Sequence, residues 1–196
     1  MGKTVLITLT LAALGFHSLG QDVYERYTNY FSVEGGVAAS FAGLGFTPSF
    51  SVYRDGHKID AGLSIKMYDI WEDGPGILGS YLSYKYFPNQ RKNEFNLYFG
   101  YHNLFTTHDK GKKYPTIVDE LSDRVTRPDK VFLLENMIGI GFDLQLGNKL
   151  YLFNDFSVGA ALDWNTFKDS ETQMEVRSTG MIRLGLGYNV GTKKAK

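Results

Sequence analysis

VFLLENMIGIGFDLQL, residues 131–146, is followed by Gly147-Asn148 and then by KLYLFNDFSVGAALD, residues 149–163. In both arms large apolar side chains occupy alternate positions, and Asn136 is the exception in the first arm. Glycine, serine and charged residues fill most of the positions between them. A period of two predicts β-strands, and Gly-Asn between two such runs predicts a hairpin turn.

Both arms are longer than strands of soluble proteins, which usually have about 5–6 residues. One face of each arm is large and apolar, and the other is small, polar or charged. This pattern is typical of strands that cross a membrane in a barrel, with lipid outside and a polar lumen inside. The stretch therefore predicts a transmembrane β-hairpin.

The same alternation recurs along the rest of the chain. It predicts six further strands, at residues 30–40, 46–54, 58–68, 77–87, 94–105 and 175–190. Together with the two arms this makes eight strands, each beside its neighbour in sequence. We therefore expect an all-β fold, an eight-stranded antiparallel up-and-down transmembrane β-barrel.

The connections alternate in length, which gives a second and independent signal. Short turns are expected at Asp55-Gly56, 88–93 and Gly147-Asn148, and longer loops at 69–76, 106–130 and 164–173. Outer-membrane barrels combine short periplasmic turns with longer extracellular loops. The exception is FAGLG at 41–45, a short turn on the long-loop side. Two minor expectations are a short helix over 117–124, where Thr116 and Asp119 resemble a capping box, and a polar tail outside the barrel at 191–196.

Residues 1–20 have the organisation of a secretory signal peptide. Lys3 precedes the apolar run 4–16, and Ser18-Leu19-Gly20 supplies small residues before Gln21. The alternative is an N-terminal membrane anchor, although the run is shorter than the roughly 20 residues of a spanning helix. We expect a signal peptide at 1–20 and an outer-membrane barrel domain at 21–196.

Composition limits the function classes. The 196 residues carry no net charge, so nothing favours nucleic acid as a partner. Cysteine is absent, which excludes disulfides and thiolate metal sites. The 22 glycines and the aromatic content of 15% suit a barrel with aromatic girdles and a tightly filled interior. No histidine pair has metal-ligand spacing, so neither a metal nor a cofactor is expected.

Charged side chains at inward positions are the candidate site. We expect them to neutralise one another in a structural network inside the lumen, because an unpaired buried charge is costly. The predicted members are Glu34, Asp60, Lys66, Lys85, His102, Glu135, Asp143, Asp155 and Arg183. Glu34 and Arg183 are expected to pair across the seam that closes the barrel, with Glu135 or Lys66 completing the network. A hydrolase site of His102 and Ser83 is the catalytic alternative, but His102 faces inward by parity, so no catalytic residue is assigned.

The strand pattern and the glycine-aromatic strand ends GIGFDLQLGNKLYL and RLGLGYNVG resemble small outer-membrane β-barrel proteins of the OmpA/OmpX-like type, as found in Bacteroidota. The resemblance covers nearly all of residues 21–196. It implies an outer-membrane location, a monomer, and membrane lipid and lipopolysaccharide as surroundings. The family includes adhesins, lipid-modifying enzymes and barrels without known activity, so it assigns no single function.

Three functional hypotheses remain open at the level of sequence. The first is a non-enzymatic outer-membrane barrel with a structural or surface-recognition role, whose loop at 106–130 meets an extracellular partner. The second is a lipid-modifying outer-membrane enzyme. The third is a soluble lipocalin-like binding barrel, which would need apolar residues inside and polar residues outside. Because an eight-stranded barrel is just wide enough for side chains to fill, no open pore is expected.

Overall fold

The computed structural model describes residues 27–40, 43–68, 77–109, 117–118, 125–126, 130–147, 149–166 and 173–194. The expected signal peptide and most of the predicted loops lie outside these residues. Eight long strands form the barrel. They are β1 (Tyr27–Ser40), β2 (Gly43–Arg54), β3 (His57–Tyr68), β4 (Ile77–Tyr86), β5 (Phe95–Asp109), β8 (Lys130–Gln145), β9 (Leu150–Thr166) and β10 (Gln173–Lys194). None of the described residues form a helix long and apolar enough to cross a membrane.

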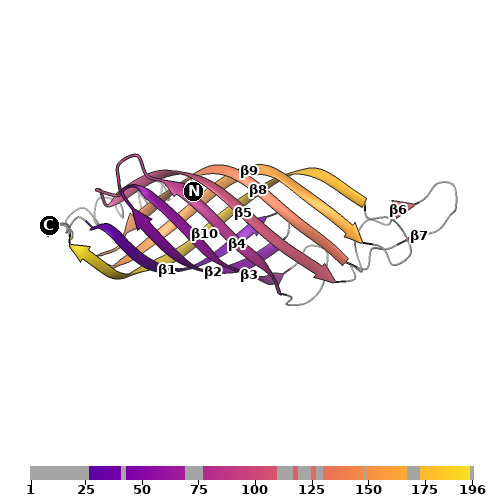
Figure 1. Cartoon of the computed structure of the whole chain (residues 1–196), viewed down its shortest axis with the longest axis horizontal. Helices are drawn as coiled ribbons and strands as arrows, with labels where there is room; N and C mark the ends of the chain where they lie inside the picture. The colour runs from indigo at the N-terminus through magenta and orange to yellow at the C-terminus, as the bar shows by residue number, and fades with distance from the viewer. Residues whose placement is uncertain are drawn as a thin grey trace, which may run out of the picture.

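The barrel is closed and antiparallel throughout (Figure 1). Every strand pairs with its neighbour in sequence, β5 pairs directly with β8, and β10 returns to β1. At this closing seam Glu34 lies opposite Gly187 and Ala38 opposite Arg183. Closure leaves no open strand edge, which is the condition for a sheet surrounded by lipid. The predicted eight-stranded up-and-down barrel is therefore confirmed.

The tight turns follow the local sequence. Asp55 and Gly56 have φ values of 49° and 89°, as a two-residue type I′ turn requires. Glycine and aspartate tolerate this left-handed region better than other residues, which explains why the sequence signal was reliable here. These turns and the end of β10 lie at the left in Figure 1, opposite the small sheet of β6 (Ile117–Val118) and β7 (Val125–Thr126).

Three predictions about chain segments were wrong. FAGLG is not a five-residue turn, because Gly43 already pairs with Ser40 and β2 begins there. The predicted tail at 191–196 belongs to the barrel as far as Lys194, because β10 continues to that residue. Lys194 pairs with Tyr27, so β1 also starts earlier than predicted. The predicted helix at 117–124 begins instead with a strand, β6 (Ile117–Val118), which pairs with β7 (Val125–Thr126) directly after the predicted range. The β-branched residues of both favour this conformation.

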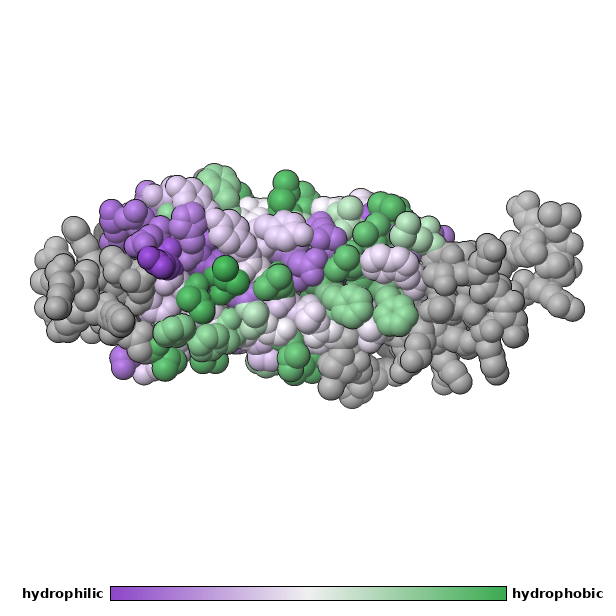
Figure 2. Space-filling model, in the orientation of Figure 1, coloured by the Kyte–Doolittle hydropathy of each residue, from purple (hydrophilic) through white to green (hydrophobic). Residues whose placement is uncertain are grey.

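The alternation of side chains sorts the barrel into two surfaces. Along β2 the burial alternates residue by residue from Gly43 to Arg54. Large apolar side chains face outward, among them Ile138 and Val158, each 68% exposed. Polar and charged side chains face inward, among them Lys58, Asp60 and Arg183, each 0% exposed. The space-filling view shows hydrophobic side chains over the middle of the barrel and hydrophilic ones gathered toward the end with the tight turns (Figure 2).

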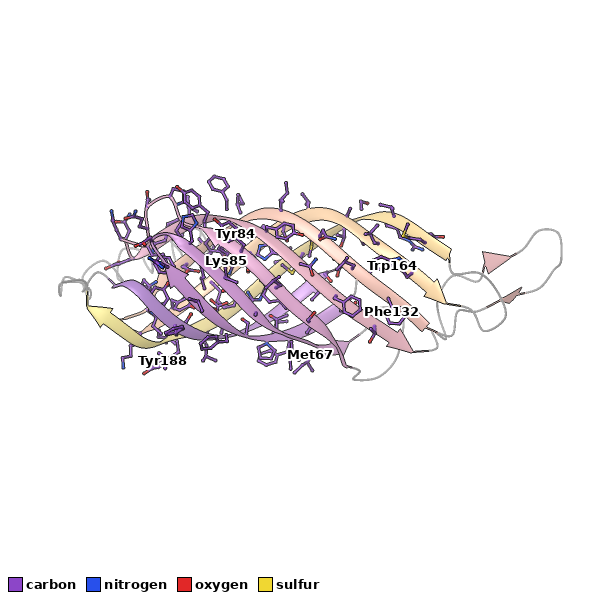
Figure 3. All side chains as sticks on the ribbon, viewed as in Figure 1. Met67, Tyr84, Lys85, Phe132, Trp164 and Tyr188 are labelled. Carbon is purple, nitrogen blue, oxygen red and sulfur yellow. The ribbon has the colours of Figure 1, made fainter. Side chains whose placement is uncertain are left out.

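Aromatic side chains mark both ends of this apolar surface. Tyr188 lies near the end with the tight turns, and Phe132 and Trp164 lie toward the opposite end (Figure 3). Phe132 and Trp164 are directly opposite each other on β8 and β9. Two aromatic girdles around an apolar band are the exterior of a membrane-spanning barrel.

Candidate functional site

The lumen is filled in layers, and the first layer at the tight-turn end is aromatic. Tyr30, Tyr53, Phe87 and Tyr98 form one buried cluster. The rings of Tyr30 and Tyr53 stack with centroids 4.6 Å apart. These side chains come from β1, β2, β5 and the start of the 87–93 turn, so the layer ties half of the barrel wall together.

Arg91 reaches into this layer from the turn between β4 and β5. Gln90 and Arg91 have φ values of 51° and 50°, and this left-handed reversal carries the chain back toward the lumen. The Arg91 guanidinium carbon lies 4.4 Å from the centroid of the Tyr151 ring and 5.1 Å from that of Tyr30. Its Nη2 is 2.8 Å from Asp143 Oδ2, and its side chain is 4% exposed. Arg91 therefore closes the lumen at this end.

The second layer is a network of buried charges. Lys58 Nζ donates a hydrogen bond to Glu34 Oε1 and lies 3.7 Å from Asp60 Oδ1. Lys85 Nζ lies 3.3 Å from Asp60 Oδ2 and 3.4 Å from Asp155 Oδ1. Each lysine thus bridges two carboxylates, which lowers the cost of holding five charges away from water.

Arg183 occupies the centre of this network. Its Nη2 lies 3.5 Å from Glu34 Oε2 and its Nη1 lies 3.4 Å from Asp155 Oδ2. Its guanidinium carbon is 4.4 Å from the ring centroids of both Tyr81 and Phe153. The planar guanidinium suits this position, because it binds carboxylates at its edge and aromatic rings on its faces. The Glu34–Arg183 approach is across the β1–β10 seam, and Lys58 and Asp155 complete the network in place of Glu135.

The buried charges of the two lower layers are balanced in number. Among the described residues, the cations in these ion pairs are Lys58, Lys85, Arg91 and Arg183. The carboxylates facing them are Glu34, Asp60, Asp143 and Asp155. This equality permits a dry interior with no counter-ion.

Above the charges lies an apolar layer, and above that a second polar group. The apolar layer consists of Ala38, Tyr81, Leu104, Met137 and Met181. Further toward the long-loop end, Glu135 accepts hydrogen bonds from Ser40 and Thr179. Asp163 pairs there with Arg177, 3.1 Å from Nε to Oδ2. The apolar layer separates this upper group from the central network.

The predicted site residues are thus distributed over several layers. Glu34, Asp60, Lys85, Asp155 and Arg183 meet in the central network. Asp143 belongs to the layer below and Glu135 to the layer above. The side chain of Lys66 lies outside the described residues.

His102 and Ser83 do not form a dyad. They are opposite each other on β4 and β5, but Ser83 Oγ donates to Asp60 Oδ2 at 2.9 Å. His102 Nδ1 shares a hydrogen bond with the Tyr81 hydroxyl at 3.0 Å, and its Nε2 lies 3.7 Å from Asp155. Both side chains are enclosed in the lumen, away from any lipid substrate. Ser83 and His102 are therefore neighbours of the central charge network, through Asp60 and Asp155.

Two buried cations of the lumen, Lys58 and Arg91, were missed in the sequence. Lys58 stands at an inward position by the same parity as Asp60, and that parity was sufficient to find it. Arg91 lies in a turn, where no periodic pattern indicates the direction of a side chain. Its role follows only from the backbone conformation of the turn.

Inward glycines provide the space for these large side chains. A Cβ on Gly187 would lie 2.2 Å from Tyr151 Cζ, and one on Gly141 would lie 2.4 Å from Tyr98 Cζ. The rings therefore lie over the backbone of the neighbouring strands.

Among the described residues no group of three or more His, Cys, Asp or Glu side chains is suited to hold a metal ion. What the lumen offers chemically is charge neutralisation and close packing.

Comparisons with known proteins bear on the architecture. No protein-family model and no curated protein matches the chain. The N-terminal β-barrel domain of Pseudomonas aeruginosa OprF is similar in structure, with 16% identity, a TM-score of 0.49, and coverage of 84% of this chain and 99% of that one. A major outer membrane protein from Thermus thermophilus has 13% identity and a TM-score of 0.46, with coverage of 84% and 100%. The barrel fold of this chain follows from its own strand register.

Proposed function

We propose that the protein is a non-enzymatic outer-membrane β-barrel with a closed lumen, whose contacts with other molecules are made by its exterior and its long-loop end. The observation that carries this proposal is the filled interior, in which Arg183, Lys58 and Lys85 are fully buried among carboxylates and aromatic rings. The proposal includes a relation to OmpA/OmpX-like barrels, which rests on the strand pattern.

The exterior supports a membrane location. A lipocalin-like barrel would hold apolar side chains inside, whereas here Phe99, Ile140 and Val158 are 60%, 58% and 68% exposed on the outside. Such a surface is stable in a bilayer and costly in water. Cell fractionation combined with heat-modifiability on a gel tests this: the folded protein is expected in the outer-membrane fraction and should migrate differently before and after boiling. Recovery in the soluble periplasmic fraction would overturn the proposal.

The lumen supports a barrel that conducts no solute. A permeating ion would have to break the Lys58–Glu34 and Lys85–Asp155 pairs and then cross the apolar layer of Tyr81, Leu104 and Met137. Planar-bilayer recording of the purified protein is expected to show no stepwise conductance. Reproducible steps that depend on ion type would contradict a closed lumen.

A recognition role for the long segment between β5 and β8 is the finer part of the proposal. Asp109 pairs with Lys130 as the last register pair of these strands, and residues 110–129 connect the two strands after this pair. It carries both acidic and basic residues, which suits a solvated surface loop. Such a segment is far longer than the usual hairpin loop of about 2–5 residues.

Proteolysis of intact cells tests this orientation. Cleavage within 110–129 is expected first, while the turn at Gly147 stays protected. A variant in which a short Gly-Ser linker replaces 110–129 should keep heat-modifiability and lose any surface-partner binding of the parent protein. Cleavage at Gly147 in intact cells would invert the orientation.

The absence of enzymatic activity has its own test. The masses of phospholipid and lipid A are expected to stay unchanged after incubation with the protein in vesicles.

A further inference from the structure

A polar cluster interrupts the apolar wall of the barrel. Tyr101 and Asn103 of β5 and Asn136 of β8 are at outward positions, between exposed apolar residues such as Phe99 and Ile140. The Asn136 Oδ1 atom accepts hydrogen bonds from the Tyr101 hydroxyl at 2.7 Å and from Asn103 Nδ2 at 2.9 Å. Asn136 is the same residue that broke the apolar alternation in the sequence.

The cluster leaves one donor group and one acceptor unused. Among the described residues no hydrogen bond involves the Asn136 Nδ2 group or the Asn103 Oδ1 atom. In the hydrocarbon region no water is available to them, and an unsatisfied polar group is costly there. Polar side chains exposed within a membrane span indicate a functional contact.

The wall is bulky on one side of the cluster and hollow on the other. Register places Leu82 beside Asn103, Asn136 opposite Asn103, and then Ala160 and Ser178 in the same row. The adjacent row runs from Tyr84 through Tyr101, Ile138 and Val158 to Gly180. The β4 side thus presents Leu82 and Tyr84, which are 49% and 41% exposed. On the β9–β10 side small residues at 160, 178 and 180 alternate with exposed valines such as Val158.

A groove follows the hollow side. It has a volume of about 650 Å³ and is lined by Ile138, Phe156, Val158, Gly180 and Ile182, among others. In the view of Figure 2 a small hydrophilic patch interrupts the hydrophobic side chains on the face that β4 and β5 cross in Figure 1. Small residues allow close approach of two backbones within a membrane.

The unused groups of Asn103 and Asn136 are complementary to those of a second copy. A two-fold axis along the membrane normal, passing in front of β5 and β8, brings Asn103 of one copy to Asn136 of the other. The unused Nδ2 of each Asn136 then donates to the unused Oδ1 of the facing Asn103, and the two bonds are equivalent by symmetry. A surface that presents both halves of its own contact fits an isologous dimer.

We propose that the wall formed by β5 and β8 is the interface of a homodimer in the membrane, centred on Asn103 and Asn136. This revises the monomer expected from the sequence, and it rests on the proposed membrane location. An acyl chain could fill the groove, but a hydrocarbon tail has no group that satisfies an amide donor and an amide acceptor together. A second copy of the chain has both.

The test is the oligomeric state of the full-length protein in phospholipid vesicles, measured by single-molecule photobleaching. The parent protein is expected to show two-step bleaching that increases with protein-to-lipid ratio. The Asn103→Leu/Asn136→Leu variant loses two equivalent hydrogen bonds and should dissociate at a concentration roughly tenfold higher. Leucine is tolerated on a lipid-facing wall, so the variant should still insert.

Matched variants on the far wall are the controls. Val33 and Phe50 lie opposite each other on β1 and β2, on the other side of the barrel, and are 52% and 50% exposed. Val33→Leu/Phe50→Leu should leave the dimer fraction unchanged. Because the chain has no cysteine, Ile138→Cys should form a disulfide-linked dimer on oxidation and Val33→Cys should not.

Heat-modifiability of each variant separates this inference from the proposed function. Failure of the parent protein to insert into vesicles would overturn both. If the parent protein inserts but stays monomeric at every protein-to-lipid ratio, the dimer alone is overturned. This holds whether or not lipid is retained at the wall. Equal cross-linking of Ile138→Cys and Val33→Cys would do the same.

Discussion

Arg91 Nη2 lies 2.8 Å from Asp143 Oδ2, so a residue of a connecting turn neutralises a carboxylate inside the barrel wall. Neither carboxylate oxygen of Asp143 has a hydrogen-bond partner among the described residues. The charge of Asp143 therefore depends on this single turn residue and on more distant cations. The turn between β4 and β5 is part of the core.

Removing Arg91 should destabilise the barrel strongly. Arg91→Met leaves the buried Asp143 carboxylate unpaired, and loss of one partner of a buried pair costs about 3–5 kcal/mol. Urea unfolding in lipid vesicles measures the effect. Lys92→Met at the exposed neighbouring position is the control and should stay within about 0.5 kcal/mol of the parent. Arg91→Met/Asp143→Asn should recover most of the loss, and no recovery would mean that Arg91 acts through its aromatic contacts alone.

Glu34 and Arg183 should be energetically coupled across the barrel seam. Glu34 Oε2 lies 3.5 Å from Arg183 Nη2, and each residue has a further charged partner, Lys58 for Glu34 and Asp155 for Arg183. A cycle of Glu34→Gln, Arg183→Met and the double variant should give a coupling energy of about 0.5–3 kcal/mol in urea unfolding. Strictly additive effects would show that Lys58 and Asp155 screen the two residues from each other.

An alanine at Gly187 should be costly because its Cβ would lie 2.2 Å from Tyr151 Cζ. Tyr151 cannot withdraw freely, since its hydroxyl donates to Glu34 Oε1 at 2.7 Å and contacts Ser32. Overpacking of this kind costs about 1–3 kcal/mol. The matched variant is Gly35→Ala on the outward face, whose Cβ meets only the end of the Phe46 ring, at 3.2 Å. Comparable losses for the two variants would argue against tight packing in the lumen.

A positive charge on the outer wall should destabilise the protein according to its depth. Ile140 lies in a row with Phe99 and Phe156 near the middle of the apolar band, so Ile140→Arg should cost about 2–4 kcal/mol in vesicles. Leu146→Arg, beside the tight turn at Gly147, should cost about 0–1 kcal/mol because the arginine reaches the interface. If both variants cost the same, the band between the aromatic girdles is not the membrane-embedded part.

The sequence alone determined the architecture and the two surfaces of this barrel. A period of two assigns each side chain to one face, so residues 131–163 were enough to separate lipid-facing Ile140 from inward Asp155. Turn positions such as Asp55-Gly56 were also determined locally, because only a few residues tolerate the left-handed conformation. Strand ends were less predictable: whether β1 begins at Tyr27 depends on its pairing with Lys194, far away in the chain.

Only the tertiary structure decided which inward charges meet. Parity places Glu34, Glu135 and Lys58 on the same face, but the stagger between strands sets their heights, so Glu34 meets Lys58 while Glu135 lies two layers away. Arg91 has no periodic signal, because a turn directs its side chain through backbone dihedrals. Asn136 was visible as an exception in the sequence, yet its partner Asn103 lies 33 residues away and is brought to it only by the register of β5 and β8. Pairing across strands is a long-range property, which alternation along one strand does not contain.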